Sequence, residues 1–179
     1  MTKVVIYMLI YNDQNAYVKK ENERTYLSFI PEDNFWRKLN KMCDFNFIRE
    51  FLKKYSPIED DHIKFFKCLL LKSYYKISTE DLLKKLDSDM TFKYFLGYDL
   101  TEIPSIEGST IDSFANVSLG NHIEREEITE AIKASLKDSI KVQTIDSFII
   151  PSTYSLTSAL TIEQFAMIFI EIIKEFISK

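Results

Sequence analysis

The stretch Phe65–Leu100 constrains the fold most, because it combines the chain's densest apolar run with its clearest helix boundaries. Its first part is apolar on nearly every side of a helix, and such a helix needs neighbours on several sides. A second helix is predicted to open at Ser78, which has Asp81 at capping-box spacing. A third, short helix is predicted to end at Gly97, as glycine commonly ends helices. We therefore expect other elements to pack around the first helix.

Composition favours a mainly α fold. The chain has 179 residues, 46% of them hydrophobic and 14% aromatic, but only three glycines and four prolines. A chain of this length can bury a sizeable core, and it is poor in the glycine and proline that turn-rich β-sandwiches need. We expect a compact multi-helix domain with a helix-turn-helix-like core, and one or two short β-strands near residues 3–11 and 140–150. For residues 3–11 a short amphipathic helix is the alternative.

The remaining elements are predicted from periodicity and end signals. The polar, charged segment up to Phe29 is interpreted as an exposed connection or hairpin. Helices are predicted to open at Pro31, with Glu32 and Asp33 in the first turn, and to cover residues 45–55, 109–114, 124–138 and 160–178. The last of these has Thr161 and Gln164 at capping-box spacing. It is apolar over most of its circumference, which indicates either burial or partner binding, with burial favoured.

The charge distribution argues against generic nucleic-acid binding. The net charge is −4, with 13 basic and 12 acidic residues between 31 and 100 but 6 and 12 from 101 onward. Proteins that bind by neutralising phosphates are usually basic, so an anionic partner would have to bind to the N-terminal and central helices.

The N-terminal apolar run is too short to span a membrane and no signal peptide is evident. We expect a cytoplasmic protein without membrane contact.

The chain has no Walker A, dinucleotide-binding, zinc-protease, nucleophile-elbow or paired-cysteine motif, and it predicts no cofactor. His62 and His122 have no partner at useful spacing, which favours solvent or helix-end roles over catalysis or metal binding. Cys43 and Cys68 are expected to be reduced core residues. The acids at 59–61 could form a metal cluster, but three acids at a helix start more often complement the helix dipole.

The central part of the chain resembles a known family. The runs FKCLLLKSYY at Phe66–Tyr75 and MTFKYFLG at Met90–Gly97 are its most specific parts, and the loop segment STIDSF follows them. Together with IPEDNFWRKLNKMCDFNFIREFLKKYS before them, they resemble the N-terminal region of bacterial insertion-sequence transposases of the DDE/RNase H-like class. The similarity covers roughly residues 30–155, and the order and spacing of the blocks matter more than any single one.

The resemblance implies a lost active site. It places Asp146, in the segment TIDSFIIPSTYS, at the family's first catalytic aspartate. That chemistry needs several carboxylates on two divalent metal ions, whereas the family's other acids lie beyond the point where this sequence ends. Phe148 stands where the family usually has histidine, and Pro151 lies where a basic residue is expected. We expect Asp146 to be a lone remnant, with no metal bound and no enzymatic activity.

Basic positions of the family also differ in this chain. The segment after the loop is rich in Arg and Lys in the family, but reads FANVSLG at residues 114–120 here, and the acidic SPIEDD at 56–61 replaces a loop that contains Gly and Arg. Each lost phosphate contact weakens salt-dependent DNA affinity. The apolar pattern of the helices is nevertheless kept, which suggests that the fold has been retained for another function.

These observations give three hypotheses for a chain divided into an N-terminal strand or connection (1–30), a transposase-like helical domain (31–120), and a catalytic-domain remnant with a final helix (121–179). The first is a non-enzymatic, transposase-derived protein of a mobile element or phage, which regulates or inhibits host or element machinery by binding a protein. The second is residual binding of double-stranded DNA, as a repressor or competitor at transposon ends, although lysines on helices are usually solvated surface. Its candidate residues are Arg49, Lys53, Lys54, Lys64, Lys67 and Lys72. The third, an active nuclease or transposase, is disfavoured.

Overall fold

The computed structural model describes residues 19–55, 61–120, 123–137 and 159–177, and these form a mainly helical fold. After a helix over residues 19–29, the helices are α2 (Phe35–Met42), α3 (Phe47–Leu52), α4 (His62–Tyr75), α5 (Thr79–Ser88), α6 (Met90–Leu96), α7 (Gly108–Ala115), α8 (Arg125–Ser135) and α10 (Ile162–Ile177). The strands predicted at 3–11 and 140–150 lie outside the described residues. None of the helices in the described ranges is long and apolar enough to cross a lipid bilayer.

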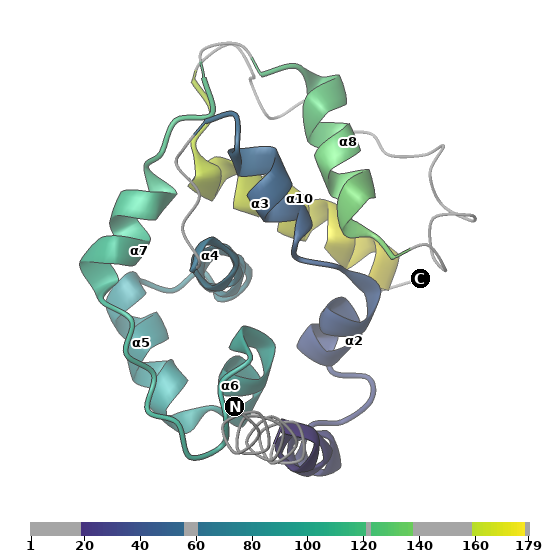
Figure 1. Ribbon diagram of the computed structural model, residues 1–179, viewed down its shortest axis with the longest axis vertical. Helices are drawn as coiled ribbons and strands as arrows, with labels where there is room; N and C mark the ends of the chain where they lie inside the picture. Colours follow the sequence, from purple (N-terminus) through teal and green to yellow (C-terminus); the bar gives the residue numbers. More distant parts are fainter. Residues whose placement is uncertain (1–18, 56–60, 121–122, 138–158, 178–179) are drawn as a thin grey trace, which may run out of the picture.

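Helix α4 lies at the centre of the molecule, as its sequence predicts. Figure 1 shows it nearly end-on, with the other helices around it. Seven of its fourteen residues are buried, and they point in several directions around the helix axis. A helix that is apolar on most sides loses water-exposed apolar surface only when it is enclosed. The buried residues are His62, Phe65, Phe66, Cys68, Leu69, Leu70 and Leu71.

Helix α10 covers α4 from the C-terminal end of the chain. The Phe66 ring lies 5.6 Å from both Phe165 and Phe169, measured between ring centroids. The helix opens with the predicted capping box, in which the Thr161 N–H donates to Gln164 Oε1 at 2.9 Å and the Gln164 N–H donates to Thr161 Oγ1 at 3.3 Å. Eight of its residues are buried, so the favoured prediction of burial is confirmed.

The boundaries predicted between α4 and α6 are also confirmed. Lys76 ends α4 in the left-handed conformation, with φ 53°, and Ser78 opens α5 by accepting a hydrogen bond from the Asp81 N–H. Gly97 ends α6 with φ 79°, a conformation that glycine adopts without the strain a side chain adds. The short turn between α4 and α5 gives the helix-turn-helix-like core that the sequence predicts.

The segment before residue 30 departs from the prediction. Residues 19–29 are helical rather than an exposed connection, and Tyr26 and Ile30 are buried. Two properties explain this. Lys, Glu and Arg favour helices even when they face solvent, and the spacing of Tyr26 and Ile30 puts both on one face. The end of the helix is held by the Arg37 guanidinium, which donates to the backbone oxygens of Leu27 and Ile30 at 3.1 and 2.7 Å.

The next helix also begins later than the sequence predicts. Helix α2 begins at Phe35, not at Pro31, and has no acid in its first turn. The reason is the Asn34 side chain, whose Oδ1 accepts hydrogen bonds from the Trp36 and Arg37 N–H groups. An asparagine at this position satisfies N–H groups that a helix leaves unpaired at its start. Residues 31–34 therefore form a turn, which the Asn34 N–H closes on Pro31 O at 3.1 Å.

The cysteines and His62 contribute to the core. Cys43 and Cys68 are free thiols and buried, as predicted, and burial raises the pKa of each to about 12. His62 is the first residue of α4 and only 3% exposed. Its ring lies 5.1 Å from that of Phe114, so it has a helix-end position in the core rather than in solvent. His122 lies outside the described residues.

Removing the Phe66 side chain should test the central position of α4. Phe66 is fully buried against Phe47, Phe165 and Phe169, so we expect Phe66→Ala to lower the free energy of unfolding by about 3–5 kcal/mol. Met167→Ala, on the exposed side of α10 at 42% exposure, is the control and should cost less than about 1 kcal/mol. Urea denaturation measures both. Equal losses for the two variants would contradict this account of the core.

Candidate interaction sites on the helical surface

The six residues predicted to contact DNA come from two neighbouring elements. Three belong to α3 or directly follow it, and three belong to α4. The first group is Arg49, Lys53 and Lys54, and the second is Lys64, Lys67 and Lys72. Their surroundings divide them into side chains held by the fold and side chains at the surface.

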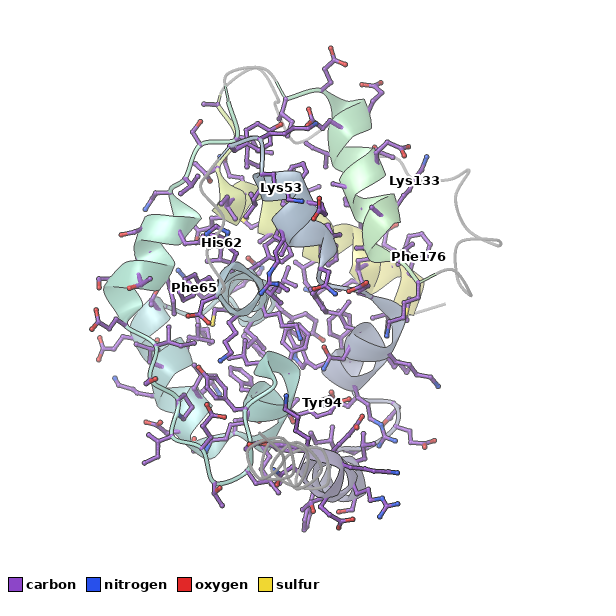
Figure 2. All side chains as sticks on the ribbon, in the orientation of Figure 1. Lys53, His62, Phe65, Tyr94, Lys133 and Phe176 are labelled. Carbon is purple, nitrogen blue, oxygen red and sulfur yellow. The ribbon has the colours of Figure 1, made fainter. Side chains whose placement is uncertain are left out.

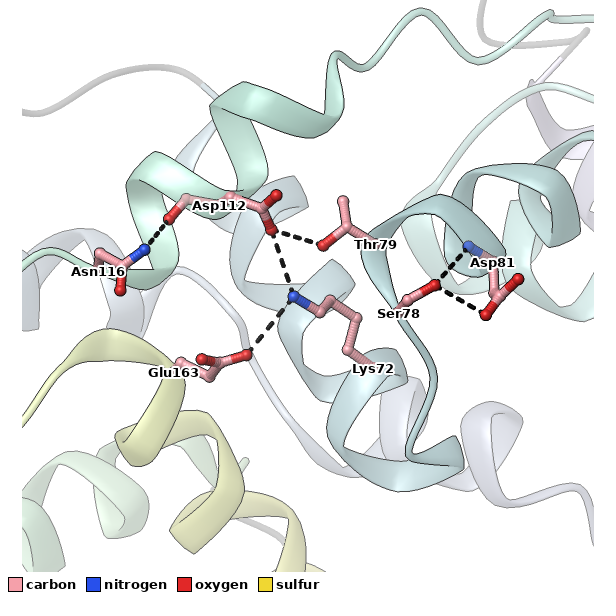
Figure 3. A network of polar contacts seen from close by, with 7 residues as sticks. All are labelled: Lys72, Ser78, Thr79, Asp81, Asp112, Asn116 and Glu163. Carbon is pink, nitrogen blue, oxygen red and sulfur yellow. Dashed lines mark hydrogen bonds and ion pairs between the residues drawn. The ribbon is translucent and has the colours of Figure 1, made fainter.

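Lys72 is held inside a polar network between helices (Figure 3). Its Nζ lies 3.5 Å from Asp112 Oδ1 on α7 and 3.5 Å from Glu163 Oε1 on α10, and its side chain is only 14% exposed. The same Asp112 oxygen accepts a hydrogen bond from Thr79 Oγ1 at 2.5 Å. Lys72 thus joins α4 to α7 and α10, and its charge faces carboxylates of the same molecule.

Lys67 is also held by the fold. Its Nζ donates to Phe95 O at 2.7 Å and to Asn40 Oδ1 at 3.0 Å, and it lies 4.5 Å and 4.8 Å from the ring centroids of Phe45 and Phe95. Loss of hydration lowers the pKa of Lys67 to about 8, because burial disfavours the charged amine. The ammonium group therefore bridges α2, α4 and α6.

Of the other four cations, Lys53 and Lys54 are exposed, whereas Arg49 and Lys64 are partly buried. Lys53 pairs with Glu50 at 2.5 Å, and both side chains are largely exposed. Lys64 Nζ lies 4.7 Å from the ring centroid of Tyr98. Exposed ion pairs contribute little to stability, so a ligand could replace such a partner at low cost. Arg49 and Lys54 line a groove between α3 and α8.

This α3–α8 groove has an apolar floor and a mainly acidic rim. Its volume is about 680 Å³. Phe47, Phe51 and Ala131 form the floor and are 7–8% exposed, while Ala134 lies on an exposed turn of α8 at the edge. The rim carries four acids against Arg49 and Lys54. The acids are Asp44, Glu50, Glu127 and Glu130.

Polar contacts fix the α3–α8 groove at both ends. At one end, Glu127 Oε1 accepts hydrogen bonds from Lys54 Nζ at 2.7 Å and Tyr55 Oη at 2.8 Å. The hydrogen bond from Lys54 is the largest cause of a lowered pKa of Glu127. At the other end, the Asp44 N–H donates to Ser135 O at 2.7 Å. Figure 1 shows α3 and α8 side by side, and the side chains drawn in Figure 2 include Lys53 after α3 and Lys133 on α8.

The predicted catalytic remnant cannot be placed in this geometry, since Asp146 lies outside the described residues. Within the described ranges, no group of three or more His, Cys, Asp or Glu side chains is arranged to hold a metal ion. The acids at 59 and 60 also lie outside them, and Asp61 directly precedes α4 without a side-chain capping bond.

Sequence reasoning missed the α3–α8 groove, because its two walls come from distant parts of the chain. Tyr55 and Glu127 are 72 residues apart in sequence, and no local pattern links them. A partial signal was present in α8, where Ala131 and Ala134 are small residues at a spacing that puts them on one face. Small residues on a helix face leave room for a neighbour.

Comparison with known proteins gives one result. Residues 24–116, just over half of the chain, match the family described as transposase domain (DUF772). The comparisons with curated proteins and with solved structures give no match. The matched range includes α2 to α7 and all six residues predicted to contact DNA. It agrees with the resemblance to the N-terminal region of transposases. The chain belongs to the DUF772 transposase domain family.

Proposed function

We propose that this chain is a non-catalytic, transposase-derived binding protein of a mobile element or phage, which regulates or inhibits host or element machinery by contact with a protein. The observation that carries the proposal is the α3–α8 groove. It is fixed at both ends and has an apolar floor, so partner binding does not require a free-energy cost for ordering the site. Its volume of about 680 Å³ suits side chains of a partner helix.

The partner's binding segment is an amphipathic helix with an apolar face and basic flanks. Helices commonly bind in grooves through apolar residues spaced along one face. Here the floor offers Phe47, Phe51 and Ala131, and acids outnumber bases on the rim. Glu50 pairs with exposed Lys53, so a basic partner residue can replace Lys53 at low cost. Complementary charge then selects the partner and speeds its association.

Protein contact is favoured over DNA contact by how the basic side chains are used. Lys67 and Lys72 have partners within the fold, and placing either on a phosphate would break contacts between helices. A cation that remains in such contacts releases no counterion from DNA, so it adds little to salt-dependent affinity. Lys67 and Lys72, two of the six candidate residues, therefore stabilise the packing between helices.

DNA binding is the second candidate function. It is favoured by the family match, which covers all six predicted residues, and by the exposure of Lys53 and Lys54, whose side chains are 49% and 66% exposed. In this case the chain would repress or compete with a full transposase at transposon ends. Arg49 and Lys64 would supplement the contacts of these two lysines.

Obstructing the α3–α8 groove should weaken partner binding. Ala134→Arg places a long cation at the edge of the groove beside the acidic rim, and we expect binding of the partner to fall by at least about tenfold, since blocking one anchor costs about 1.4 kcal/mol or more. Quantitative affinity capture from the native host, with Ser88→Arg on exposed α5 as the matched control, measures this. A partner that both variants retain equally would contradict the groove as the site.

A duplex-DNA titration separates the two candidate functions. Because Lys67 and Lys72 are held within the fold, we expect fluorescence anisotropy to show weak binding at ~50 mM salt and none at ~200 mM. Lys53→Ala with Lys54→Ala should then change little. Tight binding with a steep salt slope, lowered by this double substitution, would favour the DNA function over protein contact.

The pH dependence of stability should reveal the internal role of Lys67. Its pKa is about 8 in the fold, against 10.5 for a lysine in water, so between these values the unfolded chain holds more protons and stability rises with pH. We expect the unchanged chain to gain stability relative to Lys67→Met from about pH 8 to about pH 10. Urea midpoints across this range measure the difference. Exposed Lys53→Met is the control, and an equal slope for both substitutions would contradict the burial of Lys67.

A further inference from the structure

A second cavity lies on another side of the molecule, and neither the family nor the groove accounts for it. This Asn40 cavity has a volume of about 630 Å³ and lies between the helix of residues 19–29, α2, α6 and the end of the α8 segment. Asn40 lines the cavity, where its Oδ1 accepts a hydrogen bond from Lys67 Nζ and its backbone oxygen accepts one from Lys137 Nζ at 3.3 Å. Tyr94 on α6, labelled in Figure 2, also lines the cavity. Asn40 is therefore held by one lysine from α4 and by another from the end of the α8 segment.

The charge of the Asn40 cavity is opposite to that of the chain. Four cations line it, against the acids Glu23 and Asp99, in a chain of net charge −4. The cations are Lys19, Arg37, Lys41 and Lys137. Arg37 is committed to the end of the first described helix. The salt bridges between described residues include none of the three lysines, so their charge is available to an anion.

Aromatic rings and amides make up much of the rest of the lining. Tyr26 and Tyr94 have ring centroids 5.8 Å apart and tilted by 57°, and Tyr26 is fixed by the hydrogen bond that its hydroxyl donates to Tyr98 O at 3.1 Å. Tyr94 is half-buried, which leaves part of its ring toward the cavity. Fixed aromatic rings bind flat ring systems. The Asn22 and Asn40 amides can pair with the donors and acceptors at the edge of such a ring.

We propose that the Asn40 cavity binds a nucleoside monophosphate, either free or as the phosphorylated terminal nucleotide of a nucleic-acid strand. The three lysines take the phosphate, Tyr94 contacts the base, and the amides contact its edge. A bare phosphate would leave the tyrosine surface uncovered, and an uncharged nucleoside would leave the lysines unpaired. The volume lies within the range of sites that enclose small ligands. This site is separate from the α3–α8 groove and does not depend on it.

Calorimetric titration of the full chain with AMP tests the proposal. We expect AMP to bind, and adenosine and inorganic phosphate each to bind at least about tenfold more weakly. The double variant Lys41→Ala with Lys137→Ala should weaken AMP binding by at least about tenfold, since each charge-assisted contact is strong. Lys84→Ala with Lys85→Ala, both exposed on α5, removes the same charge outside the cavity and should leave AMP affinity unchanged. Matching urea midpoints for the two double variants show that both fold.

A second titration distinguishes the two sources of the nucleotide. A 5′-phosphorylated single-stranded oligonucleotide is compared with the same strand ending in a 5′-hydroxyl. The source is a strand end if two results hold. The phosphorylated strand binds at least about tenfold more tightly than AMP, and in the variant Lys41→Ala with Lys137→Ala it binds no more tightly than the 5′-hydroxyl strand. If AMP binds as tightly as the strand, the source is the free nucleotide. Absence of binding by both probes, adenosine binding equal to AMP, or affinity unchanged in the cavity double variant overturns the proposal.

Discussion

The structure depends on the enclosure of α4. This helix has apolar side chains in several directions, so no single neighbour can remove them from water. Phe66 alone meets rings from α3 and α10. The elements that surround α4 come from both ends of the described chain, and α8 and α10 belong to the same hydrophobic core as α2 to α7. A substitution of a buried residue in any of these helices therefore acts on one shared core.

Features whose partners are close in sequence could be predicted from the residues. Ser78 with Asp81, Thr161 with Gln164, and Gly97 at the end of α6 each act within a single helical turn. The same local reasoning fails at Asn34. Pro31 and the acids after it match a common helix start. The helix nevertheless begins after Asn34, because the Asn34 side chain accepts hydrogen bonds from the first N–H groups of the helix. The sequence thus contains two helix-start signals, at Pro31 and at Asn34, and the sequence alone does not decide which of them begins the helix.

The candidate sites are harder to predict because their contacts are long-range. The sequence suggests that Lys67 is a surface cation, yet its partners Asn40 and Phe95 lie 27 and 28 residues away. Lysine is ambiguous in sequence, since its long aliphatic stem packs on apolar surface while its amine seeks a polar partner. The same holds for the Asn40 cavity, where Lys137 lies 97 residues from the asparagine that it contacts. Charge counts along the sequence do not show which cations share a site.

The site of the proposed function lies partly inside and partly outside the family match. The match covers residues 24–116, which include the α4 core but neither α8 nor α10. Membership therefore describes the fold of the central helices, whereas one wall of the α3–α8 groove comes from α8, outside the matched range. Glu127 joins that wall to Lys54 and Tyr55 of the matched part. The proposed binding function would therefore use the family's fold for the α3 wall of the groove, whereas Glu127, Glu130, Ala131 and Ala134 of the α8 wall lie outside the family match.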